Sequence, residues 1–313
     1  MSLQPLIGIV GPTASGKTAV AAALAADLGG EVVCADSMQI YQGMSILTAK
    51  PTPEEMLGVP HHLVDFLPPE APFSVADYVT RARAMIADIA ARGKLPVLCG
   101  GTGLYVSSLI DNVRFDDTCA DEALRAELTK FALDNGNEAL WERLALIDPE
   151  TAAQLHPNNL PRVVRALEVF TLTGEKPSVR KIASRAQPSA YAPMLFGLTT
   201  STRDKLYARI NERVDGMVAA GMVEEACAFY AQYRAKTASQ AIGYKELIPY
   251  FEGTETRGAC IEKIKRESRH YAKRQLTWFR RDSRIEWLET DTIESVKKII
   301  EKIKKNIAKT EYL

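Results

Sequence analysis

The sequence is poor in the features that mark secreted, membrane-spanning and zinc-binding proteins. Only five cysteines are spread over 313 residues, and none forms a C-x-x-C pair, which argues against a disulfide framework and a zinc knuckle. No signal peptide opens the chain, and no apolar run reaches the ~18 residues that a spanning helix needs. We therefore expect a cytoplasmic protein with reduced thiols and no membrane partner.

A net charge is also missing, because 39 Lys and Arg residues balance 39 Asp and Glu residues. Overall charge therefore does not indicate a nucleic-acid-binding protein, and any basic surface must be local. Internal repeats and low-complexity tracts are absent too. The hydrophobic content of 46% is enough for one large domain with an insertion, or for two domains with a core each.

What the sequence does contain is a phosphate-binding loop near its start. The G-x-x-x-x-G-K-[ST] pattern is matched by Gly11, Pro12, Thr13, Ala14, Ser15, Gly16, Lys17 and Thr18. An apolar run at 6–10 predicts a strand before the loop, and the Ala-rich segment 18–28 predicts a helix after it. In this setting backbone N–H groups converge on a phosphate, Lys17 adds a cation, and Thr18 offers a hydroxyl to Mg²⁺. The loop predicts a polyphosphate or diphosphate site with Mg²⁺ and leaves the carrier of the phosphates open.

Two more predicted strands end near polar residues. The run 31–35 leads to Asp36 and Ser37, and the run 95–99 leads through two glycines to Thr102. In an open parallel sheet these strand ends face the same ligand crevice. Asp36 fits a turn or helix cap as well as a Mg²⁺ ligand or a catalytic base, and spacing alone does not decide between them. The adjacent His61 and His62 lack a third ligand, so we interpret them as structural or surface residues.

The alternation of strands and helices stops in the middle of the chain. From about residue 115 to 193 the patterns predict no strand, and they predict helices at 120–135, 137–147, 149–155 and 159–173. The predicted organisation is a first core part at 1–115, a helical insertion at 116–193 and a second core part at 194–313. The insertion is rich in arginine, although such a charge run is often only a solvated face.

Cationic helices dominate the last third of the chain. A helix that begins near Ser201 or Thr202 carries Arg209 and Arg213 on one face, which suits either plain solubility or a phosphate clamp. The helix 259–281 has eight Lys and Arg residues against two Glu, with Tyr271, Trp278 and Phe279 between them. Such a helix can bind a nucleic-acid backbone and stack bases, or can simply bury aromatics and expose cations.

Several stretches together resemble the tRNA dimethylallyltransferase (tRNA isopentenyltransferase) family, from about residue 6 to 290. They are the phosphate loop, Asp36-Ser37-x-Gln39-Ile40-Tyr41 with Gly43-Met44, Thr48-Ala49-Lys50-Pro51, Pro60-His61-His62-Leu63, Gly100-Gly101-Thr102-Gly103-Leu104-Tyr105, His156-Pro157-Asn158, Arg165-Ala166-Leu167-Glu168-Val169 and Lys273-Arg274-Gln275-x-Thr277-Trp278. One departure is Met44-Ser45-Ile46-Leu47 in place of Met-Asp-Ile-Gly. No carboxyl-terminal zinc finger is present, so the resemblance is to bacterial members.

The resemblance implies an α/β fold, a P-loop parallel-sheet core with a helical insertion. It implies transfer of a dimethylallyl group from dimethylallyl diphosphate to N6 of the adenosine on the 3′ side of the anticodon in tRNA, with Mg²⁺ as cofactor. It makes Asp36 the general base, Thr102 a contact to the target adenosine, and Lys17, Thr18 and Arg213 diphosphate ligands. The tRNA-contacting set would be Asp36, Ser37, Met38, Gln39, Thr102, Arg125, Pro161, Arg162, Val163, Val164, Arg165, Gln240, Ala241, Ile242, Gly243, Tyr244 and Lys245. A monomer is expected.

Three other functions fit parts of the sequence. A dimethylallyltransferase acting on AMP or ATP would need neither the helical insertion nor the cationic helix. A small-molecule kinase would bind ATP at the phosphate loop and would need a site for the phosphate acceptor. A nucleotide-switched RNA-binding protein is disfavoured as a GTPase, because no N-K-x-D-type guanine-reading motif is present.

Overall fold

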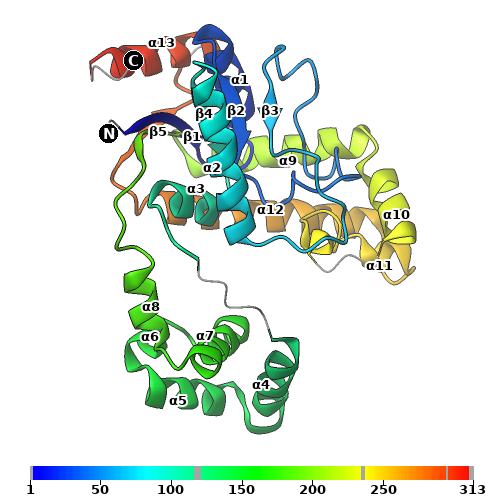
Figure 1. Cartoon of the computed structure of the whole chain (residues 1–313). Helices are drawn as coiled ribbons and strands as arrows, with labels where there is room; N and C mark the ends of the chain where they lie inside the picture. The colour runs from blue at the N-terminus through cyan, green and yellow to red at the C-terminus, as the bar shows by residue number, and fades with distance from the viewer. Residues whose placement is uncertain (1–2, 116–120, 234–236, 294, 310–313) are drawn as a thin grey trace. The chain divides into compact units, whose positions relative to one another are not determined.

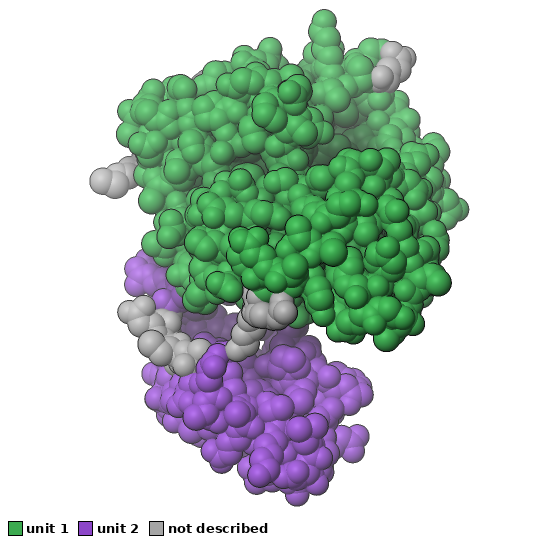
Figure 2. Space-filling view, turned by 90° about the vertical axis from the view of Figure 1, so that its right-hand side faces the viewer, with its two compact units in different colours: residues 1–110, 189–313 green, residues 111–188 purple. Residues whose placement is uncertain are grey.

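The computed structural model describes residues 3–115, 121–233, 237–293 and 295–309. The chain divides into two compact units, one formed by residues 1–110 with 189–313 and the other by residues 111–188 (Figure 2). The expected helix start at residue 120 and Cys119 lie outside the described residues. No helix in the described ranges is long and apolar enough to cross a bilayer.

A parallel sheet of six strands forms the centre of the first unit, in the order β3-β2-β4-β1-β5-β6. The strands are β1 (Gln4–Val10), β2 (Glu31–Cys34), β3 (His61–His62), β4 (Pro96–Gly100), β5 (Tyr191–Thr199) and β6 (Ile285–Glu289). The central strands are continuous apolar runs, as a parallel sheet covered on both faces requires. The prediction of an α/β fold with a P-loop parallel-sheet core is confirmed.

Two details of the sheet differ from the sequence-based expectation. His61 and His62 pair with Val32 and Val33 and so form the edge strand β3. The sequence did not predict this strand, because two polar residues give no hydrophobic alternation. The strand expected at 194–198 begins earlier, because Tyr191 already pairs with Gln4 of β1. The sequence pattern did not predict the first residues of this strand, because proline, here Pro193, is uncommon in a central strand.

Helices cover both faces of the sheet (Figure 1). On one face lie α1 (Lys17–Asp27) and α13 (Val296–Ala308), and on the other lie α2 (Val75–Ala91) and α3 (Gly103–Ile110). Ser74 caps α2 and exchanges hydrogen bonds with Asp77 in a capping box, so the predicted cap is confirmed. This arrangement leaves the carboxyl ends of the strands uncovered by the two helical layers.

The remaining helices of the first unit pack around the long segment between β2 and β3. They are α9 (Arg203–Ala219), α10 (Met222–Gln232), the 3₁₀ helix η1 (Ala238–Gln240), α11 (Ile248–Phe251) and α12 (Arg257–Phe279). A separate hydrophobic cluster joins Ile40, Tyr41 and Met44 of that segment to Phe229 of α10 and to Tyr244. The segment after Asp36 is therefore held from the side by helices that come much later in the sequence.

The second unit is entirely helical in its described residues. It consists of α4 (Glu122–Asn135), α5 (Asn137–Ile147), α6 (Pro149–Ala153), α7 (Leu160–Thr173) and α8 (Pro177–Ala183). Leu140, Leu144, Val163 and Leu167 are among the residues of its own hydrophobic core. The four helices expected here are found, and α8 is an additional one that the patterns did not indicate.

Candidate active site

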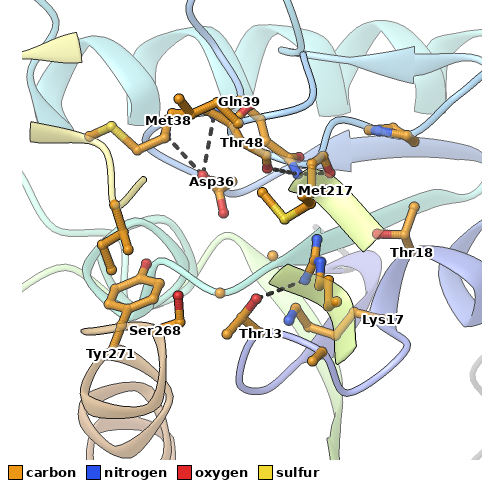
Figure 3. A pocket seen from close by; sticks show the side chains of 18 of the residues that line it. Thr13, Lys17, Thr18, Asp36, Met38, Gln39, Thr48, Met217, Ser268 and Tyr271 are labelled. Carbon is orange, nitrogen blue, oxygen red and sulfur yellow. Dashed lines mark hydrogen bonds between the residues drawn. The ribbon is translucent and has the colours of Figure 1, made fainter. Parts of the chain in front are cut away.

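A cavity of about 810 Å³ lies in the first unit, where the strands β1, β2 and β4 end (Figure 3). Its wall combines the phosphate loop, the turn at Asp36, the loop 47–51, α9, the segment after η1, and α12. The predicted convergence of the phosphate loop and the Asp36 turn on one crevice is therefore found in the structure.

The phosphate loop depends on its two glycines. Gly11 has a φ of +138°, and a Cβ there would lie 2.3 Å from the carbonyl oxygen of Leu198 in β5. Gly16 has a left-handed backbone and begins α1 as its N-cap residue. The two positions thus allow the chain to turn sharply from β1 into α1, whose N-terminus favours an anion.

Part of the phosphate loop faces the cavity and part lies behind it. Thr13, Ala14, Gly16, Lys17 and Thr18 line the cavity. Gly11, Pro12 and Ser15 are buried and do not line it. The predicted diphosphate set therefore divides into residues that can contact a ligand and residues that shape the loop.

Lys17 and Arg213 bring two cations to the phosphate loop. The Nζ of Lys17 donates a 2.6 Å hydrogen bond to the carbonyl of Pro12. The pKa of Lys17 is lowered to about 8, chiefly by burial and in part by the nearby Arg213, while Cys99 and Asp36 act in the opposite direction. Two positive charges in a poorly hydrated site repel one another until an anion is bound, so the site favours a multiply charged anion such as a diphosphate.

Arg213 reaches the loop from α9. Its Nη1 donates a 2.7 Å hydrogen bond to Oγ1 of Thr13. Arg209, four residues earlier, also lines the cavity and donates a 2.8 Å hydrogen bond to Thr290. Both arginines of the predicted helix face therefore belong to the site, which favours the phosphate clamp over plain solubility.

The carboxylate of Asp36 has two different surroundings. Its Oδ1 accepts hydrogen bonds from the backbone N–H groups of Met38 at 2.8 Å and Gln39 at 3.3 Å. Its Oδ2 accepts no hydrogen bond from the described residues and points into the cavity in Figure 3. Asp36 thus caps a turn with one oxygen and leaves the other facing the cavity, so its role as a cap is confirmed and its geometry is compatible with a second role toward a ligand.

Thr102 lies beside Asp36 but does not line the cavity. Its Oγ1 accepts a 3.0 Å hydrogen bond from the backbone N–H of Ser37. The backbone N–H of Thr102 in turn donates to the carbonyl of Ala35, and a Cβ on Gly100 would lie 2.2 Å from that same oxygen. In this structure Thr102 therefore joins the end of β4 to the turn that carries Asp36.

Sequence reasoning gave no role to Gln275, which connects two parts of the site. This side chain is 5% exposed, and its Oε1 accepts a 2.8 Å hydrogen bond from the backbone N–H of Thr13. Its Nε2 donates at 3.0 Å to the carbonyl of Gly101. The signal in the sequence was an amide side chain on the face of α12 that also carries the buried Ala272 and Phe279.

Gln39 and Tyr271 also occupy the cavity wall. The Nε2 of Gln39 donates to the carbonyls of Thr48 at 3.2 Å and Ala49 at 2.9 Å. Burial is the main reason that the pKa of Tyr271 is raised, while its contacts with Thr102 and Gln275 act in the opposite direction. The phenol is therefore a neutral hydrogen-bonding group, and the guanidinium of Arg274 lies over its ring at 5.7 Å from the ring centre.

The segment 240–245 is divided in the same way as the phosphate loop. Gln240, Ala241, Ile242 and Lys245 line the cavity, whereas Gly243 and Tyr244 do not. Tyr244 is 3% exposed and belongs to the hydrophobic cluster described above.

Within the helical unit, the predicted tRNA-contacting residues are partly core and partly surface. Val163 and Val164 are buried, and Pro161 and Arg162 are exposed in the first turn of α7. Arg125 and Arg165 are partly exposed, and both bind the fully buried Glu168, at 2.9 Å and 2.7 Å. The buried carboxylate of Glu168 therefore holds both guanidinium groups, and the rest of each group is exposed to solvent.

The residues suited to holding Mg²⁺ are few. The hydroxyl residue Thr18 and the acidic residues Asp36, Glu55 and Glu212 line the same cavity. No group of three or more His, Cys, Asp and Glu residues within the described ranges could hold a metal ion. This donor set fits an ion that keeps several waters and takes other ligands from a substrate's phosphates, which is the usual behaviour of Mg²⁺.

Taken together, the fold and site define a P-loop α/β protein whose cavity combines an anion site with a carboxylate. A family model described as IPP transferase matches residues 39–282, and one described as isopentenyl transferase matches residues 5–66. The chain belongs to the tRNA dimethylallyltransferase family, a family of prenyl-transferring enzymes, as the sequence motifs predicted.

Relatives and solved structures of known type cover nearly the whole chain. A tRNA dimethylallyltransferase of Geobacillus thermodenitrificans is 49% identical over 306 residues, covering 97% of this chain and 96% of the relative. The tRNA isopentenylpyrophosphate transferase of Bacillus halodurans has a TM-score of 0.73 at 47% identity, covering 97% of this chain and 96% of that one. A eukaryotic dimethylallyltransferase acting on tRNA has a TM-score of 0.79 at 29% identity, covering 91% of this chain and 74% of that one. These comparisons favour the tRNA enzyme over the adenylate enzyme and the kinase.

Proposed function

We propose that this protein transfers a dimethylallyl group from dimethylallyl diphosphate to N6 of the adenosine on the 3′ side of the anticodon in tRNA, releasing diphosphate. The observation that carries the proposal is the position of Asp36. A carboxylate oxygen without a partner among the described residues faces the same cavity as Lys17 and the phosphate loop. A base and an anion site in one cavity suit this reaction, because the acceptor nitrogen loses a proton while the donor carbon loses diphosphate.

Asp36 supplies the base that the acceptor needs. The exocyclic amine of adenine is a poor nucleophile, because its lone pair is delocalised into the ring. Oδ2 of Asp36 holds this amine by a hydrogen bond and takes its proton as the new C–N bond forms. The hydrogen bonds from Met38 and Gln39 to Oδ1 keep the carboxylate in place during this step.

The phosphate loop acts as a clamp for the leaving group. As the C–O bond of the allylic diphosphate breaks, negative charge grows on the diphosphate. The N-terminus of α1, Lys17 and Arg213 stabilise that charge where it develops. When bound, Mg²⁺ on the hydroxyl of Thr18 would neutralise part of the same charge. The phosphate loop would therefore serve without any phosphoryl transfer.

The acceptor base must leave its stack to enter the cavity, which costs a few kcal/mol and less in a loop than in a duplex. Arg274 of α12 and Lys245 line the cavity and can bind the RNA backbone beside it. Arg125 and Arg165 offer further donors on the helical unit.

We also propose that the protein works in the cytoplasm as a monomer.

The test is transfer of radiolabelled prenyl group from dimethylallyl diphosphate into bulk unmodified tRNA, with AMP as a parallel acceptor. Asp36→Asn is the informative variant, because its amide oxygen can still accept from Met38 and Gln39 but cannot take a proton. We expect a loss of about 10²- to 10⁴-fold in the chemical rate with tRNA affinity retained. Asp27→Asn, an exposed change at the end of α1, is the matched control.

Other outcomes of this assay would redirect the proposal. Label in AMP alone would identify an adenylate prenyltransferase. Label in neither acceptor, combined with turnover of ATP, would indicate a kinase. Equal losses of tRNA affinity and rate in Asp36→Asn would contradict the role of Asp36 as base.

A further inference from the structure

Glu225 of α10 binds three consecutive backbone N–H groups of the loop 44–50. Its Oε2 accepts from Ser45 at 2.9 Å and Ile46 at 3.0 Å, and its Oε1 accepts from Leu47 at 2.8 Å. Glu225 is half-buried and is separated from this loop by about 180 residues of sequence. It does not line the cavity.

The loop needs such a partner because of its backbone conformation. The N–H of Thr48 donates to the carbonyl of Met44, and the next N–H groups donate to Ile46 and Ser45, so the loop forms helix-like turns. The N–H groups at the start of such turns have no carbonyl partner within the turn. A carboxylate at this end also interacts favourably with the aligned peptide dipoles.

The opposite side of the same loop is held by Gln39. Its Nε2 donates to the carbonyls of Thr48 and Ala49, and its backbone N–H donates to Oδ1 of Asp36. A continuous series of hydrogen bonds therefore leads from Glu225 through the loop to Gln39 and then to Asp36. Leu47, Thr48 and Ala49 also form part of the cavity wall.

We propose that Glu225 is a positioning residue for the transfer reaction. It fixes the loop 44–50, and the loop fixes Gln39 and the carboxylate of Asp36 at the correct place in the cavity. This inference rests on the proposed function, because it assigns Glu225 a role in the step that Asp36 performs. A displacement of about 1 Å of a reacting group can lower a rate by about 10²-fold, so a residue outside the cavity can control the reaction.

The chain offers a matched control for this test. Glu224 precedes Glu225 in the first turn of α10, is exposed, and lies 3.9 Å from its nearest cation, Arg257. Glu225→Gln keeps the size of the side chain, but only one of its two terminal atoms can accept. Glu225→Asp keeps both acceptor oxygens on a side chain that is shorter by one methylene group. Glu224→Gln removes an equal charge without touching the loop.

The experiment compares these variants in prenyl transfer into tRNA, in tRNA binding and in hydrogen exchange. We expect Glu225→Gln to lower kcat about 10- to 100-fold, with tRNA Kd and the melting temperature close to those of Glu224→Gln. Glu225→Asp should fall between Glu225→Gln and the native chain. The amides of residues 45–47 should exchange faster in Glu225→Gln, while those of α10 keep their protection.

Two results would overturn the proposal. One is a kcat in Glu225→Gln equal to that of Glu224→Gln. The other is a lower kcat that follows a lower melting temperature in both variants, since this would mean general destabilisation. The hydrogen-exchange result does not depend on activity. If the native chain transfers no prenyl group, the proposed function fails, and the loop-holding role of Glu225 is still measured by exchange.

Discussion

The hydroxyl of Thr13 accepts a 2.7 Å hydrogen bond from the guanidinium of Arg213, which lies 200 residues further along the chain. The same residue donates its backbone N–H to Gln275 of α12. One residue of the phosphate loop is therefore fixed by two later helices, α9 and α12. The conformation of the anion site depends on the whole first unit, beyond the local strand–loop–helix motif.

Replacing Arg213 tests the clamp on the leaving group. Arg213→Lys keeps the charge but loses the planar fork, so it cannot hold Thr13 and a diphosphate together. We expect kcat/KM for the donor to fall about 10²-fold, the usual effect of removing one group that stabilises developing charge. Arg203→Lys, at an exposed position in the first turn of α9, should leave kcat/KM for the donor unchanged. Equal kinetics in the two variants would remove Arg213 from the clamp.

The lowered pKa of Lys17, about 8, predicts an alkaline limit to donor capture. A lysine is charged below its pKa, so the cation at the phosphate loop is lost as the pH rises through about 8. We expect kcat/KM for the donor to decrease above this pH, by about tenfold per unit. The alkaline decrease in kcat should begin at a higher pH, because bound diphosphate favours the charged form of Lys17 and so raises its pKa.

The control for this prediction is Lys17→Arg, whose side chain keeps its charge throughout the accessible range. Its absolute rate should be lower, but the alkaline decrease near pH 8 should disappear. A decrease that persists unchanged in Lys17→Arg would assign the titration to another group. The measurement is initial rate against pH at donor concentrations well below KM.

Gln275 should control donor affinity from outside the phosphate loop. In Gln275→Glu the carboxylate can still accept from Thr13, but it faces the carbonyl of Gly101 and cannot donate to it. Leaving a buried group without its partner costs about 1–3 kcal/mol, so we expect donor affinity to fall about tenfold or more. Titration calorimetry with dimethylallyl diphosphate measures this. Thr277→Ala, exposed on the same helix, should bind as the native chain does.

Glu168 should contribute to the stability of the helical unit. Burial raises its pKa, but hydrogen bonds from Arg165, the Asp121 backbone and Arg125 outweigh this effect, and the net pKa is lowered. We expect Glu168→Gln to reduce the free energy of unfolding by about 2 kcal/mol, a discounted value because both arginines are partly exposed. Glu175→Gln, which breaks the more exposed pair with Arg180, should have a smaller effect. Urea unfolding measures both.

The sign of the pH effect follows from the lowered pKa of Glu168. Its stabilising contribution is fully present above the unfolded value of about 4.3 and is lost as the pH falls through the lower folded value. The difference in stability between the native chain and Glu168→Gln should therefore shrink under acidic conditions. A difference that stays constant down to strong acid would mean that the charge of Glu168 is not what stabilises the unit.

Local patterns in the sequence predicted most of the fold. The apolar runs of β1, β2 and β4 and the amphipathic stripe of α2 with its Ser74 cap are short-range signals, which burial and backbone geometry impose on neighbouring residues. The phosphate loop was predictable for the same reason, since strand, glycines and helix lie within a few residues. The family motifs added the reaction, and the comparisons agree with that identification.

Only the tertiary structure decided how the site is held together. Two histidines become a strand because β2 offers its edge to them. Gln275, Glu225 and Glu168 each satisfy groups 43 to 262 residues away, and no periodicity encodes a partner at such a distance. Their polar atoms are costly to bury without partners, so the folded chain must supply those partners. The sequence by itself determined which chemistry is present, and long-range packing decided where each group points.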